Sequence, residues 1–323
     1  DGASLLVTVD CGVSSAAEIS LASSLGMDTI VTDHHSIPSS MPAATALVNP
    51  RRPDSRYPYD GLTGAGLAFK LVEALWSALG RPQPNHLLEL AALGTIADVG
   101  PLRGENRYLV REGLKRLNVT RHPGLRALVA RSGLRPGSLD TESLSFGLIP
   151  RLNAAGRLGS ATTSLALLTA ESTEQAAPIA EVLEQQNIER RMLTEQGMSE
   201  ASLQVELESG TPPQMIIVQH QEWLPGILGL IAGRLSETFY RPAVAISVGE
   251  QVSVASARSI PEFDIVEALR QSRKLFHRYG GHPQAAGFTV PTGDLSRLKE
   301  ELVRVAREQL DGTDLAPSIE IDC

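Results

Sequence analysis

The sequence is short of several residue patterns, and each shortage excludes a class of protein. It contains 2 cysteines in 323 residues, too few for a disulfide framework, which favours a reducing cytoplasm. No run of about 18 apolar residues occurs, so a membrane-spanning helix is not expected. No basic segment followed by an apolar stretch opens the chain, so no secretory signal peptide is visible there. We therefore expect a cytoplasmic protein without a membrane partner.

Basic residues are also scarce. The chain has 29 lysines and arginines against 37 aspartates and glutamates, a net charge of −8, which argues against a protein that coats nucleic acid through a basic surface. A polyanionic substrate stays open if a few arginines and metal ions contact the phosphates locally. The length fits two domains of ordinary size, and 42% hydrophobic residues are typical of a globular protein.

The first part of the chain predicts a strand–helix–strand unit. Residues 5–9 and 28–32 have the composition of short buried strands, and the segment between them predicts a helix. So short a crossover implies parallel strands joined in a right-handed unit. Ligands of parallel sheets bind at the carboxyl ends of the strands, which is where Asp10 and residues 33–35 lie.

The rest of the chain divides into a helical region, a long charged helix and a second α/β region. We predict an α/β protein with a first domain over residues 1–168 that contains a parallel sheet, a connecting helix over 169–210, and a second domain over 211–311 that contains a mixed sheet. Residues 312–323 resemble the first strand of a further domain. Because the chain begins with Asp1, already close to a strand, we expect it to be a fragment of a longer protein.

The metal-binding candidates near the first sheet are Asp10, Asp33, His34, His35 and Asp98. Carboxylate oxygens and imidazole nitrogens on one rim suit Mn²⁺, Mg²⁺ or Zn²⁺, and an oxygen-rich set favours the harder ions. Asp98 follows an apolar helix, so its carboxylate is expected at a helix end. Neighbouring side chains on a strand point to opposite faces, so His34 and His35 are expected to serve different purposes. Taken singly, each residue also fits a cap, a turn or an ordinary hydrogen-bonded side chain.

The second α/β region offers groups that could bind phosphate. Gly280 and Gly281, followed by His282, remove side-chain bulk where backbone N–H groups could meet an anion beside a helix N-terminus. Ser256 and Arg258 alternate with alanines on a predicted strand, so both point to one face and could bind one phosphate. The structural alternative is a tight turn at the glycines and close packing at the alanines.

A third candidate is the segment RLNAAGRL (151–158), which places Arg151, Asn153 and Arg157 in an otherwise apolar stretch. Pro150 and Gly156 argue against a plain helix here. Either the polar side chains bind phosphate, or the segment is a helix cap with two arginines extended to solvent.

Six motifs together match a known family. They are VDCG (9–12), TDHH (32–35), TIADVGPL (95–102), RLNAAGRL (151–158), ASARSIPEFD (255–264) and GGHPQAAGF (280–288). In this order they resemble the DHH phosphoesterase superfamily and, within it, most closely the bacterial RecJ family of exonucleases specific for single-stranded DNA. The resemblance extends over essentially the whole chain, and RLNAAGR is the segment that points to RecJ.

The resemblance implies a phosphodiesterase that uses two Mn²⁺ or Mg²⁺ ions in a cleft between a DHH domain and a DHH-associated domain. It implies that Asp10, His34 and Asp98 bind metal and that Asp33 orients a neighbouring histidine. The implied catalytic residues are His35, Arg151 and Asn153, and the implied substrate contacts are Arg157, Ser256, Arg258, Gly280, Gly281 and His282. Ser256 and Arg258 would form a pocket for a 5′-phosphate.

The activity implied by the resemblance is 5′-to-3′ cleavage of single-stranded DNA in repair and recombination, with release of mononucleotides. The implied partners are single-stranded DNA and a repair helicase or single-strand-binding protein, and the protein is expected to be a monomer. One departure concerns an Asp-x-Asp-Gly motif that the family carries before the first strand, where this chain has only Asp1-Gly2 and a few further residues. We therefore expect these 323 residues to bind at most one ion well and to be inactive or nearly so. The oligonucleotide-binding barrel of the family is expected to follow the last residues.

Two alternatives stay open at this point. A DHH phosphoesterase for small substrates would act on oligoribonucleotides, cyclic dinucleotides or 3′-phosphoadenosine 5′-phosphate, but such enzymes generally lack the RLNAAGR segment and the long connecting helix. A non-catalytic DHH scaffold would bind partners without metal. The intact Asp10, His34, His35 and Asp98 speak against the scaffold.

Overall fold

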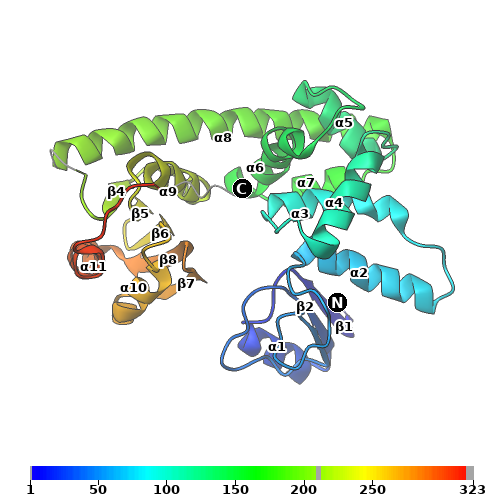
Figure 1. Cartoon of the computed structure of the whole chain (residues 1–323), viewed down its shortest axis with the longest axis horizontal. Coiled ribbons are helices and arrows are strands. Elements are labelled where there is room, and N and C mark those ends of the chain that lie inside the picture. The colour runs from blue at the N-terminus through cyan, green and yellow to red at the C-terminus, as the bar shows by residue number, and fades with distance from the viewer. Residues whose placement is uncertain (1, 209–211, 318–323) are drawn as a thin grey trace. The chain divides into compact units, whose positions relative to one another are not determined.

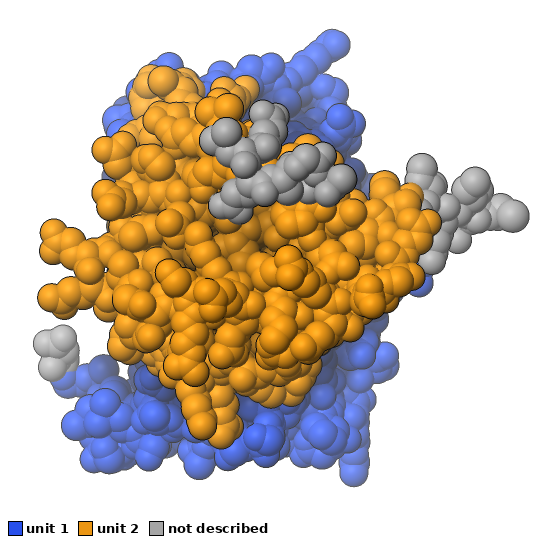
Figure 2. Space-filling view, turned by 90° about the vertical axis from the view of Figure 1, so that its left-hand side faces the viewer, with its two compact units in different colours: residues 1–152, 163–184 blue, residues 153–162, 185–323 orange. Residues whose placement is uncertain are grey.

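The structure is a computed structural model, and it describes residues 2–208 and 212–317. Contacts divide the chain into unit 1, residues 1–152 and 163–184, and unit 2, residues 153–162 and 185–323, which Figure 2 shows in two colours. Each unit contains one sheet, so the predicted fold class of two α/β regions is confirmed. The predicted domain limits at 168, 210 and 311 stay predictions, and the predicted start of a further domain reaches into residues 318–323, outside the described part.

The sheet of unit 1 has the strand order β1-β2-β3 and is parallel throughout. Its elements are β1 (Leu5–Val9), α1 (Ala16–Ser24), β2 (Asp28–Thr32) and β3 (Ala46–Val48). Figure 1 shows α1 beside these three strands in the blue part of the ribbon. The predicted strand–helix–strand unit and its parallel pairing are therefore confirmed.

The prediction that residues 5–9 form a buried strand was wrong about burial. Among the described residues β1 pairs with β2 alone, so it is an edge strand. Leu5 and Val9 are each 50% exposed, whereas Val31 on the central strand is fully buried. An apolar run predicts a strand but does not say how many neighbours cover it, since that depends on partners distant in sequence.

The remaining elements of unit 1 are helical: α2 (Gly64–Ala78), α3 (Leu88–Ala97), α4 (Gly104–Leu117), α5 (Pro123–Ser132), the first part of α6 (Ile149–Leu158), α7 (Thr162–Leu168, mostly in this unit) and the beginning of α8 (Thr173–Glu208). Leu62, Leu67, Leu88 and Leu109 form part of a buried cluster that joins α2, α3 and α4. No described helix combines the length and the apolar character needed to cross a membrane.

The segment 151–158 is part of an α-helix, although Pro150 and Gly156 were expected to argue against a plain helix there. A π-helical turn, Ser143–Leu148, leads directly into α6. The wider π turn makes room for the proline ring, which would otherwise clash with the carbonyl one turn earlier.

The sheet of unit 2 is mixed, as predicted, with the order β4-β5-β6-β8-β7; only β4 and β5 run parallel. Its elements are β4 (Ile216–His220), α9 (Pro225–Phe239), β5 (Ala243–Ser247), β6 (Val252–Arg258), α10 (Ile265–Gln271), β7 (Arg278–His282), β8 (Ala285–Pro291) and α11 (Leu295–Leu310). Alternate residues of β5 enter two different cores. Val244 packs in the core that contains α10 and α11, and Ala245 packs in the core that contains α9 and the second half of α8.

The glycines at 280 and 281 lie on a strand, and not in the tight turn that was the structural alternative for them. Gly280 pairs with Gly287 and Gly281 with Ala286 in a hairpin of β7 and β8. The φ of Gly281 is 148°, and a Cβ there would lie 2.6 Å from the Ala286 Cα, so the glycine permits close approach of the two strands. Among the described strands β7 pairs with β8 alone, so only alternate backbone groups of β7 are engaged in the hairpin.

Candidate metal centre and phosphate site

Asp10 lies at the carboxyl end of β1 with a left-handed backbone, φ 63°, which is uncommon outside glycine. Its N–H donates to the Thr32 carbonyl at 3.0 Å, so the end of β1 is tied to the end of β2. The N-terminus of α2 approaches closely: a Cβ at Gly64 would overlap the Asp10 carboxylate. Asp10 is thereby held between a strand end and a helix start.

Asp33 is buried and accepts four hydrogen bonds. Its Oδ2 accepts from the Val13 N–H at 2.9 Å, and its Oδ1 accepts from the His34 N–H at 2.8 Å, the His35 N–H at 3.1 Å and the His35 Nδ1 at 2.7 Å. Burial raises the pKa of the Asp33 carboxyl, but these donors outweigh it and lower the pKa overall. Asp33 therefore orients the His35 ring, as the predicted role requires; its relation to a metal stays a prediction.

The two histidine rings do not point to opposite faces, which corrects the expectation from strand alternation. Strand β2 ends at Thr32, and Asp33 accepts from both following N–H groups, so the backbone turns before His34. The ring centroids of His34 and His35 lie 4.6 Å apart. His34 is buried and His35 is exposed, so burial, and not direction, distinguishes them.

His34 Nε2 is the centre of a three-residue cluster. It lies 2.9 Å from Asp10 Oδ1 and 3.5 Å from Asp98 Oδ2. The atom is buried, and among the described residues no group meets hydrogen-bond geometry with it, despite the short distance to Asp10. The Asp10 carboxylate raises the pKa of His34 although burial opposes this, and burial raises the pKa of Asp98. A buried nitrogen without a hydrogen bond, between two carboxylates, fits a divalent cation such as Mn²⁺.

Potential ligand atoms of Asp10, His34 and His35 all lie within 4.8 Å of one another. His35 is thus also within range of an ion bound at Asp10, although it was predicted to contact substrate. Its Nδ1 already bonds to Asp33, which leaves Nε2 for either purpose.

Asp98 caps the C-terminus of α3, as predicted for a carboxylate at a helix end. The next residue, Val99, has a φ of 52° and is 88% exposed. Its N–H donates to the Ile96 carbonyl at 3.1 Å, and the Gly100 N–H donates to the Thr95 carbonyl at 3.0 Å. A β-branched residue in this conformation is strained, and the strain lies next to a predicted metal ligand.

Three residues near this cluster were not identified from sequence: Asn49, Arg51 and Gly64. Asn49 Nδ2 donates to the His35 carbonyl at 3.0 Å, and Asn49 Oδ1 accepts from the Arg51 N–H at 2.9 Å. The pKa of His34 and that of Asp98 are both raised overall, and the Arg51 charge is a smaller effect that opposes each rise. Asn49 and Arg51 could have been found from sequence, because they follow the third strand and side chains there reach the same edge of the sheet.

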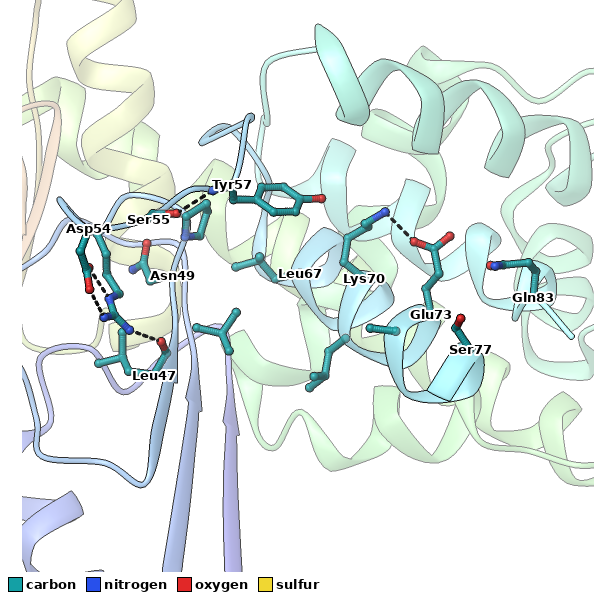
Figure 3. Close-up of a pocket in the computed structure, with 15 residues that line it drawn as sticks. Leu47, Asn49, Asp54, Ser55, Tyr57, Leu67, Lys70, Glu73, Ser77 and Gln83 are labelled. Carbon is teal, nitrogen blue, oxygen red and sulfur yellow. Dashed lines mark hydrogen bonds and ion pairs between the residues drawn. The ribbon is translucent and has the colours of Figure 1, made fainter. Parts of the chain in front are cut away.

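A cavity of about 850 Å³ lies elsewhere in unit 1, between β3, the segment that follows it and α2 (Figure 3). Lys70 and Glu73 form an ion pair at 2.5 Å on its α2 side. Asn49 lines it, but Asp10, His34 and Asp98 do not. The candidate metal centre is therefore identified by the atoms that could bind a metal ion, because the cavity does not contain it.

Unit 2 holds a second group of predicted residues. Ala255 and Ala257 pack toward α10 and α11, so strand alternation directs Ser256 and Arg258 toward α9, as predicted for one face. Arg258 Nη1 donates to Ser256 Oγ at 3.2 Å. A Cβ at Gly229 of α9 would lie 2.9 Å from Arg258 Nη2 and 3.2 Å from Ser256 Oγ, so the glycine leaves space for both.

Arg157 belongs to the same neighbourhood. Its Nη1 donates to the Gly226 carbonyl in the first turn of α9 at 3.1 Å. Burial lowers the pKa of Arg157, and burial followed by the Arg157 charge lowers the pKa of Arg258. Arg157, Ser256 and Arg258 are therefore brought together around one turn of α9, with properties that suit an anion.

Within residues 2–208 and 212–317, the other predicted residues form no hydrogen bond or ion pair with these two groups. Arg151, in unit 1, forms a bidentate ion pair with Glu184 and donates from Nη1 to the Gly147 carbonyl at 2.7 Å. Asn153 is exposed, and so are Gly280, Gly281 and His282. Their predicted catalytic and substrate contacts stay predictions, and Arg151 would have to leave Glu184 to contact a phosphate.

Comparison with known proteins agrees with this architecture. Residues 3–95 match the DHH family, N-terminal domain, and residues 213–310 match the DHHA1 domain. The single-stranded-DNA-specific exonuclease RecJ of Bacillus subtilis (strain 168) is 39% identical over 323 residues, which cover 99% of this chain and 40% of that protein. The RecJ of Salmonella typhimurium (strain LT2) is 36% identical over 96% of this chain and 57% of that protein.

Solved structures give the same result. The RecJ of Thermus thermophilus in complex with Mn²⁺ superposes with a TM-score of 0.85 and 35% identity, covering 94% of this chain and 45% of that one. A structure of exonuclease RecJ bound to manganese has a TM-score of 0.81 and 34% identity, covering 97% of this chain and 78% of that one. The chain spans about half the length of the curated relatives it matches. In sequence and in fold, the chain belongs to the RecJ family of DHH proteins.

Proposed function

We propose that the chain is the core of a metal-dependent exonuclease that degrades single-stranded DNA from the 5′ end and releases mononucleotides. The observation that carries the proposal is the buried Nε2 of His34, which lies between the Asp10 and Asp98 carboxylates without a hydrogen bond. The named activity of the RecJ relatives and the Mn²⁺ and Mg²⁺ in their structures support it.

Asp10, His34 and Asp98 would hold Mn²⁺ or Mg²⁺. A bound divalent ion supplies Lewis acidity at a phosphoryl oxygen and lowers the pKa of a water molecule. Asp33 fixes the His35 ring through Nδ1, so the exposed Nε2 is free to contact an oxygen of the scissile phosphate. Asn49 Nδ2 donates to the His35 carbonyl and so holds the His35 backbone in place.

Arg157, Ser256 and Arg258 would bind the 5′-phosphate. A guanidinium and a hydroxyl recognise phosphate oxygens and carry no base information, so the proposed activity has little sequence preference. The DNA-repair context, the helicase or single-strand-binding partner and the monomeric state remain predictions from the resemblance, and so does the cytoplasmic location.

The test is degradation of a long 5′-phosphorylated single strand by the whole protein in Mn²⁺, compared with a duplex and with a dinucleotide. We expect mononucleotides from the single strand alone, and loss of this activity in His34→Ala and Asp98→Ala. Cleavage restricted to the dinucleotide would support the small-substrate alternative, and unchanged activity in both variants would support the scaffold.

A further inference from the structure

Three partly buried arginines come from three elements of unit 2 that pack around the first part of α9, which is the neighbourhood meant below: Arg157 of α6, Arg190 of α8 and Arg258 of β6. Leu158, next to Arg157, and Leu193, one turn after Arg190, both pack against the core cluster that contains Ile227 and Leu228 of α9. Burial lowers the pKa of each, and the Arg157 charge lowers the pKa of the other two further. Within residues 2–208 and 212–317, none of the three has a carboxylate at ion-pair distance. Partly buried cations without counter-charge are unfavourable, so the neighbourhood suits an anion.

Arg190 is the member that neither the motifs nor the proposed function has used. Its Nη2 donates to Asn187 Oδ1 at 2.8 Å, one helical turn earlier on α8. Asn187 is 3% exposed, so this contact is fixed inside the unit. Arg190 Nε is buried and finds no hydrogen-bond partner in the described part of the chain. The Arg190 guanidinium is thus held in one orientation, and its buried Nε–H can donate to a further acceptor.

The opposite wall of the neighbourhood is the first part of α9. Arg157 Nη1 donates to the Gly226 carbonyl, and Arg258 Nη2 lies against Gly229, three residues further on the same helix face. A Cβ at Gly226 would overlap the Arg157 carbonyl, so Gly226 permits close approach of α6, and Gly229 leaves space for the Arg258 guanidinium. The N-terminal turn of a 15-residue helix adds partial positive charge on this side.

We propose that Arg190, oriented by Asn187, is the third cationic group of the phosphate site formed by Arg157, Ser256 and Arg258. The site thereby selects a doubly charged terminal phosphate over a singly charged internal phosphodiester. A phosphate monoester carries a charge of about −1.5 to −2 at pH 7, so it can use a guanidinium beyond those that a diester needs. The assignment of the ligand as a DNA 5′ end rests on the proposed function, but phosphate selectivity does not require metal or cleavage.

The experiment measures binding of a short thymidine oligonucleotide to the chain by calorimetry, with EDTA present so that cleavage does not contribute. Three versions of the oligonucleotide carry a 5′-phosphate, a 5′-methyl phosphate or a 5′-hydroxyl. We expect the 5′-phosphate to bind most tightly. Arg190→Gln should weaken 5′-phosphate binding about tenfold, the size of a lost charge-assisted hydrogen bond, and leave the other two within about twofold.

The matched control is Arg191→Gln, which removes the same charge from the next, exposed position of α8. It should change all three affinities by less than about twofold. Arg190→Lys should retain part of the preference, and Asn187→Asp, which offers Arg190 an internal counter-charge, should reduce it. Equal effects of Arg190→Gln and Arg191→Gln, or equal binding of the phosphate and the methyl phosphate, would overturn the proposal.

Folding is checked by thermal unfolding without ligand. Because Arg190→Gln removes an unpaired cation, we expect its unfolding temperature to equal or exceed that of the unsubstituted chain. If the whole protein shows no DNA cleavage while 5′-phosphate selectivity depends on Arg190, the proposed function fails and this inference stands.

Discussion

At the scale of single residues, Asp33 determines the geometry of the candidate metal centre without being its predicted ligand. One carboxylate accepts from the Val13, His34 and His35 backbone and from the His35 ring. The carboxylate therefore ends the strand and brings the two rings to the same side. A protonated or amidated side chain could not accept all four bonds.

We predict that Asp33→Asn lowers the free energy of unfolding at pH 7 by about 1–3 kcal/mol, the cost of weakening buried hydrogen bonds to a charged group. The folded-state pKa of Asp33 is lowered, so its contribution is present above the unfolded pKa of about 3.9 and disappears as the pH falls through the folded value. Urea unfolding at pH 7, 4 and 3 should show a difference between the two chains that shrinks with acid.

The control for this substitution is Glu18→Gln, which alters an exposed carboxylate of α1. It should change the free energy of unfolding at pH 7 by less than about 0.5 kcal/mol. A constant difference between Asp33→Asn and the unsubstituted chain from pH 7 to pH 3 would contradict the assigned role of the charge.

A second residue-scale prediction concerns Gly64. A methyl group there would overlap the Asp10 carboxylate, so Gly64→Ala should displace Asp10 from His34. We expect Mn²⁺ affinity, measured by calorimetry on the chain, to fall about tenfold, as for other residues that position a metal ligand. Gly293→Ala, where a methyl group would meet open space, is the matched control. Unchanged Mn²⁺ binding in Gly64→Ala would show that Asp10 does not need its present position.

At the scale of elements, the C-terminus of α3 combines a predicted ligand with backbone strain. The helix ends through the Asp98 cap and the left-handed Val99, a position at which glycine is usual. The side chain of Val99 is exposed, so burial of apolar surface does not offset the backbone strain at this residue. It holds the chain in the turn that follows Asp98.

We predict that Val99→Gly raises the free energy of unfolding by up to about 1 kcal/mol, because the left-handed conformation costs about 1–2 kcal/mol for a residue with a Cβ and part of the gain is lost to glycine flexibility. Val119, which is 77% exposed and follows α4 without a positive φ, supplies the control. Val119→Gly should destabilise the chain slightly. Chemical denaturation of both variants measures the free energy of unfolding. A lower value for Val99→Gly than for the unsubstituted chain would contradict the strain at Val99.

At the scale of the whole molecule, the two units carry separate binding groups of opposite preference. Unit 1 presents carboxylates and imidazoles for a cation, and unit 2 presents arginines and a serine for an anion. A net charge of −8 is therefore compatible with binding a polyanion, because the cationic groups are concentrated locally.

We predict that Mn²⁺ and inorganic phosphate, added in separate experiments, each raise the temperature of thermal unfolding. At 100 times its dissociation constant, a ligand stabilises the native state by about 2.7 kcal/mol. His34→Ala should abolish the Mn²⁺ effect and keep the phosphate effect, and Arg258→Gln should do the reverse. If either variant loses both effects, the two sites are not independent.

Local sequence was sufficient for the parallel strand–helix–strand unit, for the mixed second sheet, for Asp98 at a helix end and for Ser256 and Arg258 on one strand face. Each of these depends on residues close together in the chain, through strand alternation, helix capping and short crossovers. The motifs were also sufficient to indicate the family.

Tertiary structure decided the features that depend on distant partners. The exposure of β1 depends on which strands lie beside it, and Arg151 is engaged by Glu184, 33 positions away. Pairing with β8 places Gly280 and Gly281 on a strand, Asn187 holds the Arg190 guanidinium, and Gly229 leaves space for Arg258. Chain order specifies which groups are available, but only packing brings groups from separate elements within hydrogen-bond distance.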